Sequence, residues 1–356
     1  KLVDEFNIAT HNSSYTNFTQ TDYDELKARR NDTTENPARP WVVTGADGRY
    51  HYYGNFNWYN YLFDYSQPTW NNNLNITGGN KKFNYVISGS ANDHNGIYAV
   101  STDKYHTRTL MAKFNAEATP WLDISASASL FKSKYKQPGY DYEDGGNIGN
   151  LTFHAMPWIS PINPDGTNVY TLPNSGDRPA DGFTAMLRTG NGFTGVNKTQ
   201  HTYALGATIH ILPGLDLVGK YTYRTFIKDK QFRSASFDYS ERPGKILTAN
   251  SGFFANRLKD IRTTDDVSDY DLFATYTKTF NNAHNLNVVV GTNYETEHYK
   301  NVEASSYNIQ SEVLNDLALG TGNKGVKGGQ HEYALLGYFG RVSYDYFGKY
   351  LAEVNM

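Results

Sequence analysis

Apolar and polar residues alternate with a period of two along much of the chain. The clearest run is 122–130, where every second residue is apolar and the residues between are aspartate or serine. Successive side chains of a strand point to opposite faces, so this run predicts a strand with one apolar and one polar face. The same alternation recurs in 74–87, 110–116, 203–211, 215–223, 270–280, 286–294 and 336–344. We therefore predict about ten strands of roughly 9–15 residues, longer than the usual 5–6.

The connections between these strands fall into two classes. Tight turns rich in Gly, Pro and Asn are predicted at 78–81, 119–121, 212–214, 281–284 and 347–349. Long connections are predicted at about 91–104, 133–199, 229–265 and 299–332. The two classes alternate along the chain. Short periplasmic turns and long extracellular loops are typical of outer-membrane barrels, whose strands need about 9–11 residues to cross the apolar layer. The pattern predicts an all-β, antiparallel transmembrane β-barrel segment.

This prediction assigns each face of the sheet to a solvent. The residues expected to face lipid include Leu122, Ile124, Leu205, Ile209, Leu272 and Val288. Their polar neighbours are expected to face water in the lumen. Aromatic residues gather near the tight turns, where an interfacial girdle is expected: Trp121, Phe280, Tyr344, Tyr346, Phe347 and Tyr350. The alternative is that aromatic residues simply favour strands.

Two regions are distinguished along the chain. Residues 1–69 are less regular: one short helix is predicted at 23–30, and 41–58 has an aromatic, Gly- and Asn-rich composition. Residues 70–356 contain the predicted barrel strands and loops. The sequence begins at Lys1 without the basic and apolar regions of a signal peptide. We expect the chain to be a fragment that omits the plug domain and the remaining strands of a larger barrel.

Composition narrows the function classes. The 356 residues carry a net charge of −3, which argues against a nucleic-acid partner. Hydrophobic residues make up 38% and mean hydropathy is −0.64, yet 15% of residues are aromatic, too many for a disordered chain. Low hydropathy is compatible with barrel strands, because only alternate residues face lipid. The absence of cysteine excludes thiol chemistry and cysteine-ligated metals.

Several short motifs together resemble the SusC-like TonB-dependent transporters of Bacteroidetes. The motifs are NWYNYLF at 57–63, NLNITGG at 73–79, FNYVISGS at 83–90, NGI at 95–97, WLDI at 121–124 and YFGRVSYDYFGKYL at 338–351. The last is the closest match. They cover most of 57–356 in the family's order, and their order and spacing carry more weight than any one motif.

The resemblance implies a function that alternation alone does not. Members of this family are plugged barrels of about 22 strands. They pair with a SusD-like surface lipoprotein that closes the barrel as a lid. They import oligosaccharides or peptides across the outer membrane with energy relayed by TonB. The chain departs from the family pattern by omission, since neither a plug nor a TonB-contacting segment is found in it.

Candidate chemistry in the sequence is sparse. The chain contains none of the hydrolase-elbow, zinc-protease or phosphate-loop motifs, so we expect no enzyme and no cofactor. Asp141, Glu143 and Asp144 form an oxygen-rich stretch with a weak resemblance to a calcium loop, but a solvated loop is the simpler interpretation. The adjacent acids Asp265 and Asp266 do not make a glycosidase pair. His210 is expected on the polar wall.

The long connection at 133–199 is the best candidate for substrate contact. Its aromatic residues offer flat faces that stack on sugars and pack against peptides: Tyr140, Tyr142, Trp158, Tyr170 and Phe193. The alternative is that these rings pack the loop onto itself or onto a lid partner.

Two other function classes stay open at this point. A passive outer-membrane porin would share the same wall without a plug. A secreted β-rich protein that binds or hydrolyses glycans would bury its apolar faces against each other in a sandwich.

Overall fold

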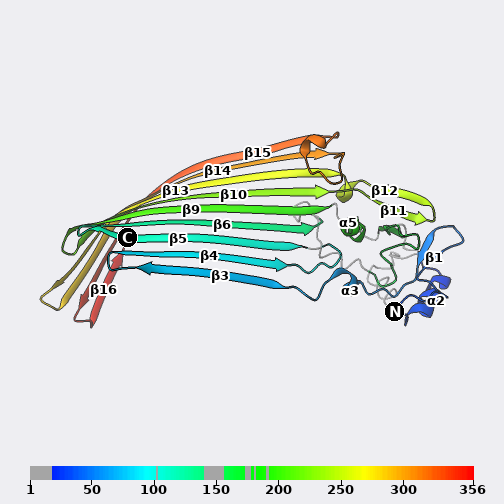
Figure 1. Ribbon diagram of the computed structural model, residues 1–356, viewed down its shortest axis with the longest axis horizontal. Helices are drawn as coiled ribbons and strands as arrows, with labels where there is room; N and C mark the ends of the chain where they lie inside the picture. The colour runs from blue at the N-terminus through cyan, green and yellow to red at the C-terminus, as the bar shows by residue number, and fades with distance from the viewer. Residues whose placement is uncertain (1–17, 102, 140–155, 173–177, 180–181, 190–191) are drawn as a thin grey trace.

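The structure, a computed structural model, describes residues 18–101, 103–139, 156–172, 178–179, 182–189 and 192–356. Its main feature is one ten-stranded antiparallel sheet (Figure 1). Within the described residues, no helix is long and apolar enough to cross a membrane. The strands in spatial order are β3 (Thr69–Gly79), β4 (Phe83–Asn95), β5 (Lys104–Thr119), β6 (Leu122–Pro138), β9 (Phe193–Leu212), β10 (Leu215–Ser234), β13 (Arg257–Phe280), β14 (His284–Tyr307), β15 (Lys324–Tyr346) and β16 (Tyr350–Asn355).

The ten predicted strands are confirmed, but most of them are longer than the predicted 9–15 residues. β13 and β14 each contain 24 residues, and they extend far into the connections predicted at 229–265 and 299–332. Beyond the apolar run polar residues predominate on both faces of these strands and the few apolar ones do not alternate, so the period-two signal disappears. The backbone pairing nevertheless continues, as in Asp229 opposite Arg262. Hydrophobic alternation marks where a strand has one apolar face and does not mark where the strand ends.

The sorting of the connections is confirmed. The five tight turns lie together at one end of the sheet and the long connections lie at the other (Figure 1). Local chemistry explains the tight turns. Gly214 has a φ of +88° between β9 and β10, and Asn281 and Asn282 have φ of 51° and 55° between β13 and β14. These residue types adopt left-handed backbone conformations at the lowest steric cost.

The register places the predicted apolar residues on one face. Residues directly opposite each other in an antiparallel pair lie on the same side of the sheet. One such row crosses nine strands: Gly78, Tyr85, Phe114, Ala126, Leu205, Tyr221, Tyr270, Tyr294 and Leu336. All six residues predicted to face lipid share this face. Leu205 is 60% exposed and Leu272 is 51% exposed, so the face is not covered by the described chain.

The buried core lies at the end of the sheet that carries the long connections. Three chain segments meet there, namely 18–63, 156–189 and 235–255, and we refer to their described residues as the loop cluster. Its elements are α2 (Gln20–Arg29), β1 (Val42–Thr44), β2 (Tyr50–Tyr52), α3 (Trp58–Leu62), β7 (Thr171–Leu172), β8 (Arg178–Pro179), α5 (Phe183–Thr189), β11 (Phe237–Arg242), β12 (Lys245–Ala249) and η3 (Gly252–Phe254). A further short turn, η4 (Leu317–Leu319), precedes β15. The irregular N-terminal region therefore shares one core with two of the long connections.

Helix α2 confirms the short helix predicted at 23–30 and begins three residues earlier. A capping box starts it: Thr19 accepts a hydrogen bond from the Asp22 amide, and the Asp22 carboxylate accepts one from the Thr19 amide. Tyr53 donates a hydrogen bond to the same carboxylate. Arg29 donates to the carbonyl oxygens of Arg39 and Pro40. The helix is thus attached through polar contacts rather than through a strongly apolar face.

Candidate functional site

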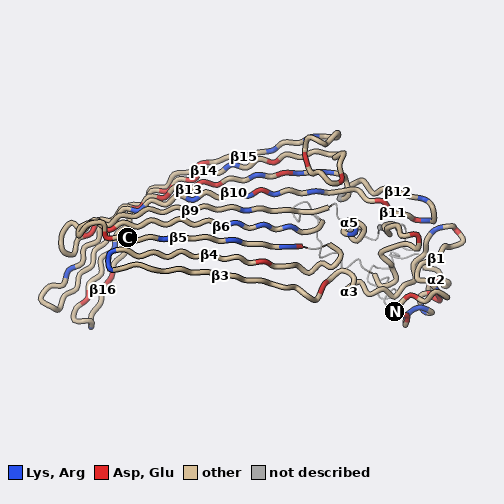
Figure 2. Tube along the Cα trace, viewed as in Figure 1, with Lys and Arg blue, Asp and Glu red and all other residues tan. Residues whose placement is uncertain are grey.

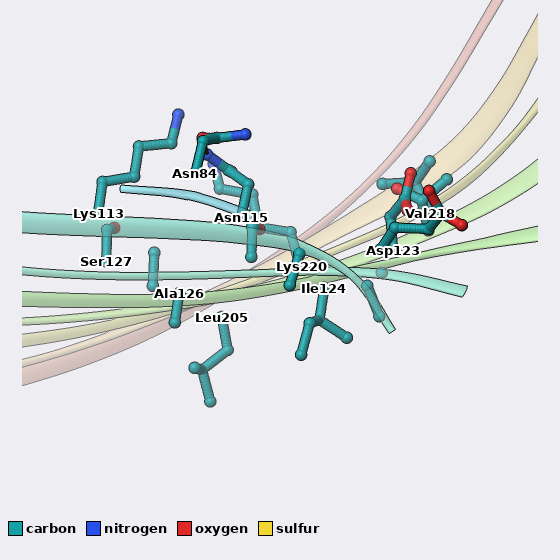
Figure 3. Close-up of a pocket in the computed structure, with 18 of the residues that line it drawn as sticks. Asn84, Lys113, Asn115, Asp123, Ile124, Ala126, Ser127, Leu205, Val218 and Lys220 are labelled. Carbon is teal, nitrogen blue, oxygen red and sulfur yellow. Dashed lines mark hydrogen bonds between the residues drawn. The ribbon is translucent and has the colours of Figure 1, made fainter. Parts of the chain in front are cut away.

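The polar face of the sheet contains a hollow of about 580 Å³ over β4, β5, β6, β9 and β10. Figure 3 shows Asn84, Lys113 and Asn115 pointing to one side of the sheet, whereas Ile124 and Leu205 point to the other. The Asn115 side-chain amide donates a hydrogen bond to the side-chain oxygen Oδ1 of Asn84 at 2.8 Å. The hollow is thus lined by charged and amide groups that would contact water or a polar solute.

Small side chains on β6 and β9 create this space. Ser125 and Ser127 stand on β6, and Gly206 lies opposite Ser125 on β9. A Cβ atom added at Gly206 would approach the Ser125 hydroxyl oxygen to 2.5 Å. Any larger residue at position 206 would displace that serine and fill part of the hollow. Sequence alternation predicted a polar face here, but not that its residues would be small enough to leave a cavity.

His210 lies on the polar face at the tight-turn end, as predicted. Its Nδ1 is 2.7 Å from an Asp216 carboxylate oxygen, and its Nε2 is 3.2 Å from a carboxylate oxygen of Asp123. The imidazole therefore links β6, β9 and β10 across the wall. This arrangement accounts for His210 as a polar wall residue.

The polar face of β13–β15 is more acidic. Asn293 donates hydrogen bonds to Asp269 and Asp271, each at 2.8 Å. The Tyr333 hydroxyl donates to Glu295 at 2.6 Å. The polar face therefore changes in charge across the sheet, from lysine and asparagine on β4 and β5 to carboxylates on β13–β15. Such a wall can sort solutes by charge.

Asp265 and Asp266 lie inside β13, not in a loop, and cannot act as a pair. As neighbours in a strand they point to opposite faces. Asp265 lies on the polar face, 3.7 Å from Arg224, and Asp266 accepts a hydrogen bond from the Tyr223 hydroxyl on the other face. The structure thus agrees with the view that these acids do not form a glycosidase site.

Of the three predicted substrate-contact residues that the structure describes, two lie in the loop cluster and one lies on the sheet. Trp158 is 5% exposed in the loop cluster, where Phe18 packs edge-on against its ring. Tyr170 packs edge-on against Phe237 and Phe254 in the same core. Phe193 lies at the start of β9 on the apolar side of the sheet, with the Lys136 ammonium 4.8 Å from its ring centre. Substrate contact by these three residues stays a prediction.

The remaining predicted residues lie outside the described part of the chain. These are the aromatic residues Tyr140 and Tyr142 and the calcium candidates Asp141, Glu143 and Asp144. Among the residues that the structure does describe, no group of three or more His, Asp or Glu side chains is arranged to hold a metal ion.

Polar contacts across the loop cluster connect residues far apart in sequence. Tyr52 donates a hydrogen bond to Asn163 at 2.8 Å, and Tyr50 donates to Asp165 at 2.8 Å. Burial and the Asp165 carboxylate raise the pKa of Tyr50 to about 12. Residues 163–166 form a tight turn, with the Gly166 amide donating to the Asn163 carbonyl at 2.9 Å. The local sequence does not predict the distant partners of Tyr50 and Tyr52.

Comparison with known proteins connects this fold to transporters. No family model and no curated protein matches the sequence. The chain is similar to a solved structure of the RagAB peptide transporter, with a TM-score of 0.66 and 18% identity over 86% of this chain and 32% of that one. It is also similar to the RagAB peptide importer in an "open-open" state, with a TM-score of 0.70 and 19% identity over 96% of this chain and 40% of that one. The chain thus spans about two fifths or less of the length of these neighbours. At this identity the likeness establishes the fold.

Proposed function

We propose that the chain forms wall and extracellular loops of a SusC-like importer in the bacterial outer membrane. In this proposal the apolar face meets lipid, the polar face lines the lumen, and the loop cluster lies on the extracellular side. The assembled protein takes up oligopeptides with TonB-supplied energy and a SusD-like lipoprotein lid. The wall guides solute and performs no chemistry of its own.

The observation that carries this proposal is the pair of chemically opposite faces on one long sheet. Leu205, Leu272 and Val290 project from one face and are at least half exposed. Within the described residues no second sheet packs over them. Exposed apolar area on this scale is unfavourable in water and expected in lipid. This weighs against the secreted sandwich, in which a second sheet would cover the face.

The fold comparison supports the choice of cargo. The neighbours are described as peptide transporters and importers, so peptides are preferred here over oligosaccharides. The lined hollow suits a peptide, because Lys113, Asn84 and Asn115 offer groups that hydrogen-bond to carboxylates and amides. The acidic wall of β13–β15 would complement basic side chains in the same way.

Uptake by cells tests the proposal. Cells that produce the full-length protein together with a SusD-like lipoprotein should accumulate labelled oligopeptides, and a protonophore should abolish accumulation. The variant Gly206→Leu, which fills the hollow from β9, should reduce uptake, whereas Ala207→Leu, on the opposite face of the same strand, should not. Protonophore-insensitive uptake would instead identify a passive porin. If neither the wild-type protein nor any variant accumulated labelled oligopeptide, the result would contradict an importer.

A further inference from the structure

Five cationic side chains gather on the apolar side of β5 and β6, just beyond the apolar residues. We name them the cationic patch: Lys104, Arg108, Lys132, Lys134 and Lys136. All five are exposed. Figure 2 shows the three lysines of β6 as blue stretches in the half of the strand nearest the long connections. The register places this patch on the same face as Leu110 and Leu130, which form the adjacent row of the apolar face.

The arrangement within the patch opposes sheet stability. Arg108 lies directly opposite Lys132, and Lys104 lies directly opposite Lys136. Like charges directly opposite each other in an antiparallel pair are destabilising. Asp93 on β4 binds Arg108 through two hydrogen bonds, at 2.8 and 3.0 Å. Among the described residues, no carboxylate forms an ion pair with Lys132, Lys134 or Lys136, so a negative partner from outside the chain would relieve this repulsion.

An apolar groove begins at the edge of the patch. It has a volume of about 410 Å³ and lies between Leu74, Leu110 and Leu130, with Arg108 and Lys132 at its polar end. Gly89 on β4 keeps the groove open. A side chain at this position would project into the empty space of the groove, since a Cβ atom there would meet only a backbone oxygen, at 3.8 Å. A slot lined by leucines, ending at two cations, fits an acyl chain joined to an anionic headgroup.

We propose that this surface binds one phosphorylated glycolipid of the outer leaflet, with phosphates on the cationic patch and an acyl chain in the groove. The spacing favours a headgroup with more than one phosphate. Lys132 and Lys136 are four residues apart along β6, or about 13 Å between their Cα atoms, so two separate phosphates can each meet a lysine without drawing the like charges together. The inference rests on the proposed membrane-spanning role, because that role places the apolar face in lipid.

Lipid titration of the full-length protein in phosphatidylcholine nanodiscs tests the inference. Bisphosphorylated lipid A is the probe, compared with monophosphorylated lipid A and phosphatidylglycerol, and bound lipid is counted by native mass spectrometry. The wild-type protein should bind the bisphosphorylated lipid most tightly. Each cation near an anionic surface contributes about fivefold in affinity, so Arg108→Gln with Lys132→Gln should weaken binding by about 25-fold.

Three further measurements separate the effects of patch charge, groove shape and protein stability on lipid binding. Lys198→Gln with Lys228→Gln removes a facing lysine pair from the polar face and should leave lipid affinity unchanged. Gly89→Leu fills the groove without changing charge and should weaken binding. The single variant Lys132→Gln should melt no lower than wild type without added lipid, since it removes the repulsion with Arg108 and keeps the Arg108–Asp93 ion pair.

The outcomes are distinct. Equal affinity of the Arg108→Gln, Lys132→Gln variant and the wild type overturns the lipid site alone, as does equal binding of phosphatidylglycerol and bisphosphorylated lipid A. Failure of the wild-type protein to enter phosphatidylcholine nanodiscs overturns the membrane role and this inference with it.

Discussion

The sheet and the loop cluster contain similar large apolar residues, but the sheet exposes them and the loop cluster buries them. In the sheet, large apolar side chains such as Leu205 and Leu272 stay exposed, and long backbone ladders connect the strands. In the loop cluster, large apolar side chains such as Tyr52, Leu62 and Trp158 are buried against each other. A two-stranded sheet carries Tyr52, a short helix carries Leu62, and a turn carries Trp158.

In the proposed function this difference reflects two surroundings: water around the loop cluster and lipid against the apolar face of the sheet. A chain folded entirely in water would bury the apolar face of its sheet, because exposed apolar surface of this extent is unfavourable. The loop cluster follows the rule for water and the sheet does not. In the proposed function the same chain carries a water-adapted core at one end and a lipid-facing wall along its length, and variants matched across the two regions should respond differently.

The largest difference between the two regions is expected when a tryptophan in each is replaced by alanine. Trp158→Ala should destabilise the loop cluster by about 3–5 kcal/mol, since it removes a buried ring. Hydrogen exchange of α2 and β11 measures this. Trp121→Ala removes a ring that is 53% exposed at a tight turn and should leave that exchange unchanged. Loss of peptide binding with no change in exchange would instead place Trp158 in the substrate site.

A charge on the wall tests the two faces of β6. Ile124→Lys places an ammonium on the apolar face and should destabilise the membrane-inserted protein by about 2–4 kcal/mol. Ser125→Lys, one residue along, places it on the polar face and should have a much smaller effect. Denaturant unfolding in lipid vesicles measures both variants. Equal losses would show that the assigned faces are wrong.

Removing a buried amide should have an intermediate effect on the loop cluster. Asn163 is buried, accepts from the Tyr52 hydroxyl and donates to the Ser240 carbonyl at 3.0 Å. Asn163→Ala should weaken the cluster by about 1–3 kcal/mol, because buried partners lose their hydrogen bonds. Asn60, which is exposed and bound only to Tyr65 through its side chain, provides the control: Asn60→Ala should shift hydrogen exchange little. Similar shifts for both variants would argue against a buried network.

The smallest expected effect is a pH dependence of α2. Burial opposes ionisation of Asp22, but hydrogen bonds from Tyr53 and Thr19 outweigh it and lower the pKa of this carboxyl below its usual 3.8. A carboxyl with a lowered folded-state pKa stabilises the fold above pH 3.8, and that contribution is lost as pH falls through the folded-state value. Proteolysis at 20–29 should therefore accelerate below pH 3.8. Asp22→Asn should remove this dependence, whereas Asp24→Asn, at an exposed site, should keep it.

The sequence was sufficient for the architecture because the sheet depends on a local rule. Alternation in 122–130 and 270–280 identified strands and their faces, and glycine or asparagine identified tight turns such as 213–214 and 281–282. Strand ends were missed, since β13 begins well before Tyr270, in residues 257–269 that are mostly polar on both faces. That continuation is held by backbone pairing with β10 and β14, which no local pattern records.

The candidate site was less predictable because it depends on distant contacts. The residues near Tyr52 in the sequence do not predict that its hydroxyl donates a hydrogen bond to Asn163, which lies 111 residues away. Trp158 and Tyr170 were noted as aromatic residues in a long connection, but their neighbours come from 18 and 237–254. The cationic patch was also missed, because Lys132, Lys134 and Lys136 become significant only when the register brings Arg108 and Lys104 opposite them.

Accessibility along β6 tests the central claim most directly. The chain has no cysteine, so single cysteines at 124, 126 and 128 and at 125, 127 and 129 can each be labelled without background. In the membrane-inserted protein, the odd positions should react with a charged maleimide and the even positions should resist it, because the reactive thiolate forms in water and is suppressed in apolar surroundings. A strict alternation over these six positions supports a wall between lipid and water. Equal reaction of all six with the charged reagent would contradict it.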